Sequence, residues 1–134
     1  MIAAAEATKP KQVLIVEDEN GTAILMKKLL EKNFDVEVDV AEDIVSAREK
    51  LAACSFDIVT LDYFLPDGYG SDLLQVLAEM PDRPAVIVVT GQTGEKMADS
   101  FREIGVDCFI VKNQAMTGLL TEAVGRVLGG EAQA

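Results

Sequence analysis

The chain has 134 residues, enough for one domain that buries its own core without a metal or disulfide. Twelve basic residues against 23 acidic ones give a net charge of −11, which argues against direct binding to nucleic acid or an anionic membrane. The same charge favours cationic ligands or basic protein partners. The sequence contains no histidine, so a catalytic or metal-binding histidine is excluded within it.

The two cysteines, Cys54 and Cys108, lack the close spacing of a metal or redox motif. We expect both to be buried, reduced thiols, which suits a cytoplasmic protein. The first ten residues have no basic region before an apolar stretch, and no apolar run approaches the length of a membrane span. The sequence therefore predicts neither a signal peptide nor a membrane-spanning segment.

Five short apolar segments are typical of β-strands. The first, VLIV, and the fourth, AVIVVT, are continuously apolar, which predicts strands buried on both faces. The second, DVEVDVA, alternates with a period of two, which predicts a strand near a sheet edge with one polar face. The predicted strands cover residues 13–16, 35–41, 57–61, 85–90 and 108–112.

Apolar residues at helical spacing follow each predicted strand. The third predicted helix opens at Gly70 or Ser71 and stops before Pro81. The predicted helices cover residues 21–32, 43–53, 71–80, 94–104 and 115–128. In the first of them we expect one apolar side made of Ile24, Leu25, Met26, Leu29 and Leu30.

The regular alternation of strands and helices predicts an α/β fold, a doubly wound five-stranded parallel sheet covered on both faces. We expect this domain to cover residues 11–128, with a flexible lead-in at 1–10 and a flexible tail at 129–134. In such sheets, ligands bind beyond the carboxyl ends of the strands, where the strand order reverses.

Acidic residues follow two of the predicted strands. Glu17, Asp18 and Glu19 come after the first strand, and Asp62 ends the third. If these strands are neighbours, Glu17 and Asp18 approach Asp62, and two carboxylates about 4 Å apart repel by roughly 4 kcal/mol at an effective dielectric near 20. Three ionised carboxylates therefore need a cation, and Mg²⁺ prefers oxygen ligands of this kind. Glu19 is interpreted as an ordinary acid at the start of the next helix.

Two further strands end in polar residues, Thr90 after the fourth and Lys112 after the fifth. Either residue alone is unremarkable, as strand filler or as a solvated lysine. Together, a hydroxyl and an ammonium beside a carboxylate–Mg²⁺ site form a pocket for a phosphoryl group. The meeting of four strand ends therefore predicts one phosphoryl-binding site.

The pattern resembles the receiver domain of two-component response regulators. The matching features are the acidic pair Glu17 and Asp18, the aspartate Asp62 with Pro66 four residues later and Gly70 eight later, and then Thr90 and Lys112. The resemblance covers about residues 11–128. It implies a flavodoxin-like (βα)5 fold with strand order 2-1-3-4-5.

The resemblance also implies roles at the site. Asp62 would accept a phosphoryl group from a phospho-histidine on a partner histidine kinase or histidine phosphotransfer protein. Asp18 would bind Mg²⁺ directly, Glu17 would bind it through water, and the backbone carbonyl of Phe64 would supply another ligand. Lys112 would pair with the acyl phosphate.

A switch is implied as well, rather than an enzyme acting on external substrates. Thr90 would move toward the phosphoryl oxygens, and Phe109, three residues before Lys112, would follow it inward. The face formed by the fourth helix, fifth strand and fifth helix would then change its contacts with a downstream effector protein. Self-association into a homodimer is left open.

The sequence departs from the family pattern at three positions. The acidic pair is Glu-Asp rather than Asp-Asp, and Asn113 replaces the proline that most often follows the lysine. Because a cis non-proline bond costs about 3–4 kcal/mol, we expect the Lys112–Asn113 bond to be trans. Phe64, two residues after Asp62, is bulky and apolar, and we hypothesise that it slows hydrolysis of the acyl phosphate.

Three alternative functions fit these residues less well. A phosphatase of the haloacid dehalogenase type would need a second aspartate where Phe64 stands. A flavodoxin-like cofactor binder would need a glycine loop after the first strand, where this chain has the acidic segment VEDEN. A degenerate receiver that acts as a phosphorylation-independent interaction module stays open, although the complete set of acids, threonine and lysine favours the phosphorylatable form.

Overall fold

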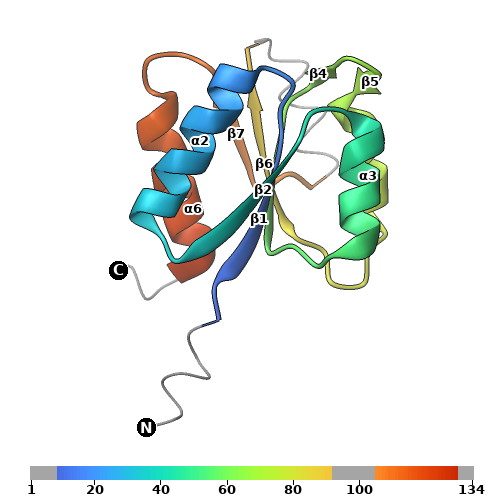
Figure 1. The fold of residues 1–134 in the computed structure, drawn as a ribbon, viewed down its shortest axis with the longest axis horizontal. Helices are drawn as coiled ribbons and strands as arrows, with labels where there is room; N and C mark the ends of the chain where they lie inside the picture. The colour runs from blue at the N-terminus through green and yellow to red at the C-terminus, as the bar shows by residue number, and fades with distance from the viewer. Residues whose placement is uncertain (1–8, 92–104, 130–134) are drawn as a thin grey trace, which may run out of the picture.

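A computed structural model describes residues 9–91 and 105–129, in which five parallel strands form one sheet (Figure 1). The strands lie in the order β2-β1-β3-β6-β7, which is 2-1-3-4-5 when only the parallel strands are numbered. The predicted order is therefore confirmed, as is the edge position of the alternating second strand. The strands are β1 (Lys11–Val16), β2 (Val36–Ala41), β3 (Ile58–Leu61), β6 (Ala85–Thr90) and β7 (Cys108–Val111).

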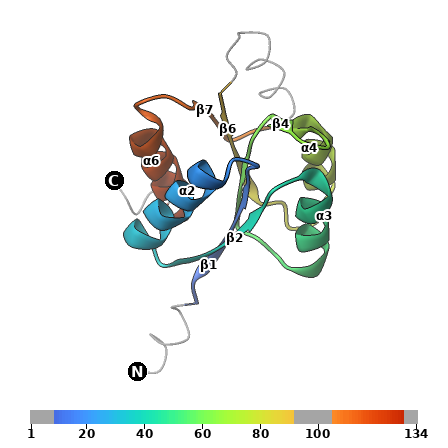
Figure 2. The same ribbon diagram turned by 45° about the horizontal axis from the view of Figure 1, so that its top comes forward.

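Helices cover both faces of the sheet. Helices α2 (Asn20–Asn33) and α6 (Met116–Gly129) lie together on one face, and α3 (Ile44–Ala53) and α4 (Gly70–Ala78) lie on the other (Figures 1 and 2). This arrangement confirms the doubly wound fold. The helix predicted at 94–104 lies outside the described residues, as do residues 1–8 and 130–134 of the predicted lead-in and tail. No helix in the described part of the chain has the length and apolarity needed to cross a bilayer.

The sheet separates two apolar cores, and strand β1 contributes to both. Val13 and Ile15 pack with α2 and α6, whereas Leu14 and Val16 pack with α3 and α4. Successive side chains of a strand point to opposite faces, so a run of four apolar residues is required here. The carboxyl end of β1 therefore emerges between the two cores, which fixes the position of the residues that follow it.

The apolar side predicted for the first helix was partly wrong. Met26 and Leu30 are buried, together with Ala23, but Ile24 and Leu25 are each 48% exposed. Successive residues turn by about 100° around a helix, so residues 24, 25 and 26 do not share one face. The small Ala23 takes the inward position instead.

The prediction that both cysteines are buried was also wrong. Both thiols are free, as expected, but Cys54 is exposed and Cys108 is only partly buried. Cys54 is the C-cap residue that follows α3, beyond the last turn that packs on the sheet. Cys108 begins the edge strand β7, which has a neighbour on one side only.

A short antiparallel hairpin, which the sequence did not predict as strands, connects β3 to α4. It consists of β4 (Phe64–Leu65) and β5 (Gly68–Tyr69), with Leu65 paired to Gly68. Pro66 and Asp67 form the tight turn between them. The sharp turn expected at Pro66 and Gly68 is therefore present, and Figure 1 shows the hairpin beside one end of α3.

Candidate functional site

Three carboxylates from two strands meet at the carboxyl edge of the sheet. Strands β1 and β3 pair in parallel with Val16 opposite Leu61, so the next residues, Glu17 and Asp62, lie at the same height. The amide of Asp62 donates to the carbonyl of Val16 at 3.1 Å and locks this register. One carboxylate oxygen each from Glu17, Asp18 and Asp62 lies within 4.8 Å of the others. The convergence predicted from the sequence is therefore confirmed.

Lys112 joins this cluster from the far edge of the sheet. Its Nζ lies 2.6 Å from Oε1 of Glu17 and 2.9 Å from Oδ2 of Asp62. Glu17 and Asp62 are only 2% and 6% exposed, whereas Asp18 is exposed. With all groups ionised, the three carboxylates and the ammonium of Lys112 carry a net charge of −2. A hard divalent cation fits both this charge and the all-oxygen donor set, and exposed Asp18 leaves it room to keep bound water.

The surroundings of the cluster shift two pKa values. Burial raises the pKa of Glu17 above its ordinary 4.5, against the opposing hydrogen bonds from Lys112 and from the backbone amide of Glu19. Burial works to lower the pKa of Lys112, but its hydrogen bonds to Glu17 and Asp62 outweigh that effect and raise it above 10.5. Lys112 therefore stays cationic at neutral pH and serves as the cluster's resident counter-charge.

Thr90 and Phe109 lie on the two strands next to the cluster. Thr90 ends β6 and is fully buried, and its carbonyl accepts the amide of Lys112 at 2.8 Å. Phe109 is opposite Val88 in the β6–β7 pair and packs, half-buried, against the core on the α3 and α4 side. No peptide bond in the described segments is cis, so the Lys112–Asn113 bond is trans as expected.

The loop after Asp62 is held close to the site by Gly70. The amide of Gly70 donates to the carbonyl of Tyr63 at 2.5 Å, and a Cβ on Gly70 would overlap the carbonyl oxygen of Asp62. Three aromatic rings gather beside this loop. Phe64, which is 43% exposed, has its ring centroid 4.7 Å from that of Tyr63 and 5.8 Å from that of Tyr69.

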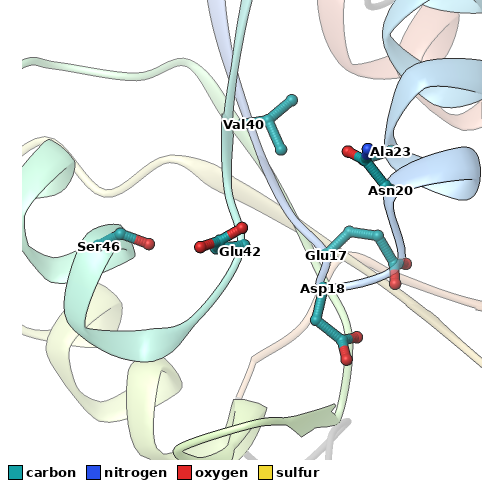
Figure 3. Close-up of a pocket in the computed structure, with 7 residues that line it drawn as sticks. All are labelled: Glu17, Asp18, Asn20, Ala23, Val40, Glu42 and Ser46. Carbon is teal, nitrogen blue, oxygen red and sulfur yellow. The ribbon is translucent and has the colours of Figure 1, made fainter.

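A cavity of about 540 Å³ adjoins the cluster. Figure 3 shows Glu17 and Asp18 at its right-hand side, at the end of β1, while Glu42 follows β2 and Ser46 belongs to α3. Sequence reasoning missed Glu42, although an acid after the second strand repeats the signal used for Asp62. The lining residues are Glu17, Asp18, Asn20, Ala23, Val40, Glu42 and Ser46.

The model of the response regulator receiver domain matches residues 13–124 of this chain. The chain therefore belongs to the response regulator receiver domain family. The matched segment includes β1 from Val13 onward, the other four strands of the parallel sheet and all the carboxylates of the cluster.

Curated relatives are longer chains that this chain matches over part of their length. The chain is 35% identical over 103 residues to protein-glutamate methylesterase/protein-glutamine glutaminase 3 of Burkholderia thailandensis, covering 75% of this chain and 29% of that protein. It is 31% identical over 120 residues to the transcriptional regulatory protein CutR of Streptomyces coelicolor, covering 88% of this chain and 53% of CutR. The chain thus spans about a third to a half of these relatives.

Solved receiver structures share the whole fold. The non-phosphorylated HemR receiver domain of Leptospira biflexa is 31% identical, with a TM-score of 0.80, and 90% of this chain covers 94% of it. A CheY-like response regulator receiver domain protein of Methanospirillum hungatei is 25% identical, with a TM-score of 0.81, and 94% of this chain covers all of it. The fold and the receiver class therefore rest on both sequence and structure.

Proposed function

We propose that this receiver domain is a phosphorylatable switch and that Asp62 is its phosphoacceptor. The observation that carries the proposal is the meeting of Glu17, Asp18 and Asp62 within 4.8 Å, with Lys112 paired to two of them. Asp62 directly follows the central strand β3, and Nζ of Lys112 already lies at hydrogen-bonding distance from one of its oxygens. A phosphoryl group on Asp62 would meet that ammonium at once.

The transfer itself needs one nucleophile and charge neutralisation. A carboxylate oxygen of Asp62 forms a bond to phosphorus, the P–N bond to the donor imidazole breaks, and the bonding pair returns to the histidine nitrogen. Mg²⁺ held by Asp18, Asp62, the Phe64 carbonyl and, through water, Glu17 would neutralise the phosphoryl oxygens. Lys112 orients the acyl phosphate and balances its charge. The chain has no histidine, which fits a phosphoryl donor located elsewhere, and we expect that donor to be a histidine kinase or a histidine phosphotransfer protein.

The conformational response is proposed to pass through Thr90 and Phe109. Thr90 moves its hydroxyl toward the new phosphoryl oxygens, and Phe109 follows inward. In support of this proposal, the amide of Lys112 donates to the carbonyl of Thr90, which joins the end of β6 to the end of β7, the strand that carries Phe109. The face formed by β7 and α6, together with the helix predicted at 94–104, which lies outside the described residues, would then change its contacts with an effector protein.

Phosphorylation by a small acyl-phosphate donor tests the proposal directly. Wild-type protein incubated with Mg²⁺ and acetyl phosphate should gain the mass of one phosphoryl group, measured by intact-protein mass spectrometry. Asp62→Asn should gain none, and a chelator should abolish the gain in wild type. If wild type stays unmodified with Mg²⁺ present, the proposal is wrong and the degenerate, interaction-only receiver becomes the better description.

A further inference from the structure

Asp67 lies in the turn of the β4–β5 hairpin, and its carboxylate binds a different element of the fold. Oδ1 accepts the amide of Ile44 at 2.8 Å and Oδ2 accepts the amide of Val45 at 3.0 Å. These are the first two residues of α3, whose amides have no acceptor inside the helix. The side chain of Asp67, in the loop that follows Asp62, thus binds the amino end of α3.

Helix α3 has its own N-cap, so Asp67 is an additional attachment. Asp43 accepts the amide of Ser46 at 2.8 Å, and the hydroxyl of Ser46 returns a hydrogen bond to the backbone carbonyl of Asp43 at 3.2 Å. Asp43 belongs to the segment that leads directly into the helix. Asp43 and Asp67 accept hydrogen bonds from different amides of the first turn of α3. Of these two residues, Asp67 belongs to the hairpin and therefore links it to that turn.

The hairpin and the helix are also in van der Waals contact. Gly68 has a φ of 155°, and a Cβ at this position would lie 2.7 Å from Cδ1 of Ile44. A larger residue at Gly68 would therefore require the end of the Ile44 side chain to move, so glycine suits the close approach of the turn to α3. Ile44 is itself buried in the core between the sheet and α3.

The same hairpin begins two residues after Asp62 and ends at α4. Phe64, whose carbonyl is the expected backbone ligand, pairs with Tyr69 across it. The loop is anchored at its base by the bond from the Gly70 amide to the Tyr63 carbonyl. The bonds from Asp67 to α3 add an anchor at the opposite end, which leaves the ligand-bearing residue between two fixed points.

We propose that Asp67 is a positioning residue for the phosphoacceptor site: by fastening the hairpin to α3, it holds the carbonyl of Phe64 in place for the cation. The effect on cation binding rests on the proposed function, whereas the attachment of the loop does not. Loss of a group that orients a metal ligand costs about tenfold or more in metal affinity.

Asp67→Ala and Asp43→Ala form a matched pair, because each removes acceptors from the first turn of α3 and only the former releases the hairpin. Hydrogen exchange of the 63–70 segment, without Mg²⁺ or phosphodonor, should be faster in Asp67→Ala than in Asp43→Ala. Mg²⁺ titration by calorimetry should show about tenfold weaker binding in Asp67→Ala and a near wild-type constant in Asp43→Ala. Asp67→Asn, which keeps one acceptor oxygen, should fall between Asp67→Ala and wild type.

Two results would overturn the inference: equal exchange of the hairpin in the two alanine variants, or faster exchange in Asp67→Ala with unchanged Mg²⁺ affinity. A wild-type protein that binds no Mg²⁺ would contradict the proposed function instead. In that case the exchange comparison alone decides whether Asp67 holds the loop.

Discussion

Lys112 reaches across two strands of the sheet to pair with Glu17, with its Nζ 2.6 Å from Oε1. The two residues follow β7 and β1, and β3 and β6 lie between these strands. The partners differ in exposure, since Lys112 is 21% exposed and Glu17 is almost completely buried. The buried acid therefore depends on this lysine for its charge balance whenever no cation is bound.

Removal of Lys112 should destabilise the cation-free protein. Lys112→Ala leaves Glu17 and Asp62 as neighbouring buried acids with no counter-charge, and breaking a buried pair in this way costs about 3 kcal/mol. Urea unfolding in the presence of a chelator measures the free energy of unfolding. Lys50→Ala is the control, because Lys50 pairs with the exposed Asp39 at 2.9 Å and its loss should cost about 0.5 kcal/mol or less. Equal losses of unfolding free energy in the two variants would contradict the dependence of buried Glu17 on Lys112 for its charge balance.

Mg²⁺ should stabilise the wild-type fold and should do so through Asp18. At a concentration of one hundred times the dissociation constant, a ligand that binds only the folded state adds about 2.7 kcal/mol. Asp18→Asn removes an exposed carboxylate of the cluster, so the melting-temperature gain produced by Mg²⁺ should shrink sharply. Glu42→Gln removes a carboxylate that lines the same cavity outside the cluster, and it should keep most of the gain. A reversed order of the two variants would place the cation beside Glu42.

Phe64 is expected to prolong the life of the acyl phosphate. Its ring packs edge-on to Tyr63 beside the loop, and we expect it there to restrict the approach of water to the acyl phosphate. Phe64→Asn should therefore lose the phosphoryl group about tenfold faster, equivalent to about 1.4 kcal/mol in activation free energy. The decay of phosphorylated protein after removal of the donor gives the rate. Phe64→Leu keeps an apolar side chain and should decay close to the wild-type rate, and an unchanged rate in Phe64→Asn would rule out this role.

Gly70→Ala should damage the site without adding any polar or charged group. The added Cβ would collide with the carbonyl oxygen of Asp62, so the loop must shift, at a cost of about 3 kcal/mol, and phosphorylation should slow. Gly21→Ala is the matched control within α2, because no atom lies within 4 Å of the added Cβ. That variant should be more stable by roughly 0.5–1 kcal/mol, with unchanged phosphorylation. Thermal unfolding and the rate of mass gain measure both effects.

The contribution of Asp67 to stability should disappear in acid. The hydrogen bond from the Ile44 amide, with that from Val45, lowers the pKa of Asp67 below its ordinary 3.8. A lowered pKa means that the folded state favours the charged carboxylate, so this stabilisation is complete above pH 3.8 and is lost as the pH falls through the folded pKa. The difference in unfolding free energy between wild type and Asp67→Asn should therefore shrink below pH 3.8. A difference that persists unchanged would mean that the charge of Asp67 is unimportant.

Much of the fold follows from local patterns. The period of each apolar run distinguished the buried strands from the edge strand β2, and the acids after β1 and β3 indicated the site because parallel strands end at a common edge. Thr90 and Lys112 were found by the same rule. These features depend on residue order along single elements, which a sequence displays directly.

The features that were missed depend on contacts between distant segments. The turn at Pro66 and Gly68 is visible in the sequence, but the bonds from Asp67 to Ile44 join residues 23 positions apart. The exposure of Ile24 and Leu25 likewise depends on which face of α2 packs on the sheet. In a helix rich in leucine and isoleucine, more than one face is apolar enough to do so. The exposure of Cys54 reflects where α3 stops relative to the core.

The two-sided packing of β1 limits how this protein tolerates changes in length. Insertion or deletion of one residue within Val13–Val16 would exchange the side chains supplied to the two cores and would also move Glu17 and Asp18 out of step with Asp62. A single-codon indel there would thus disrupt packing and chemistry together. In variant libraries of this chain, length changes should survive after α4 far more often than within β1.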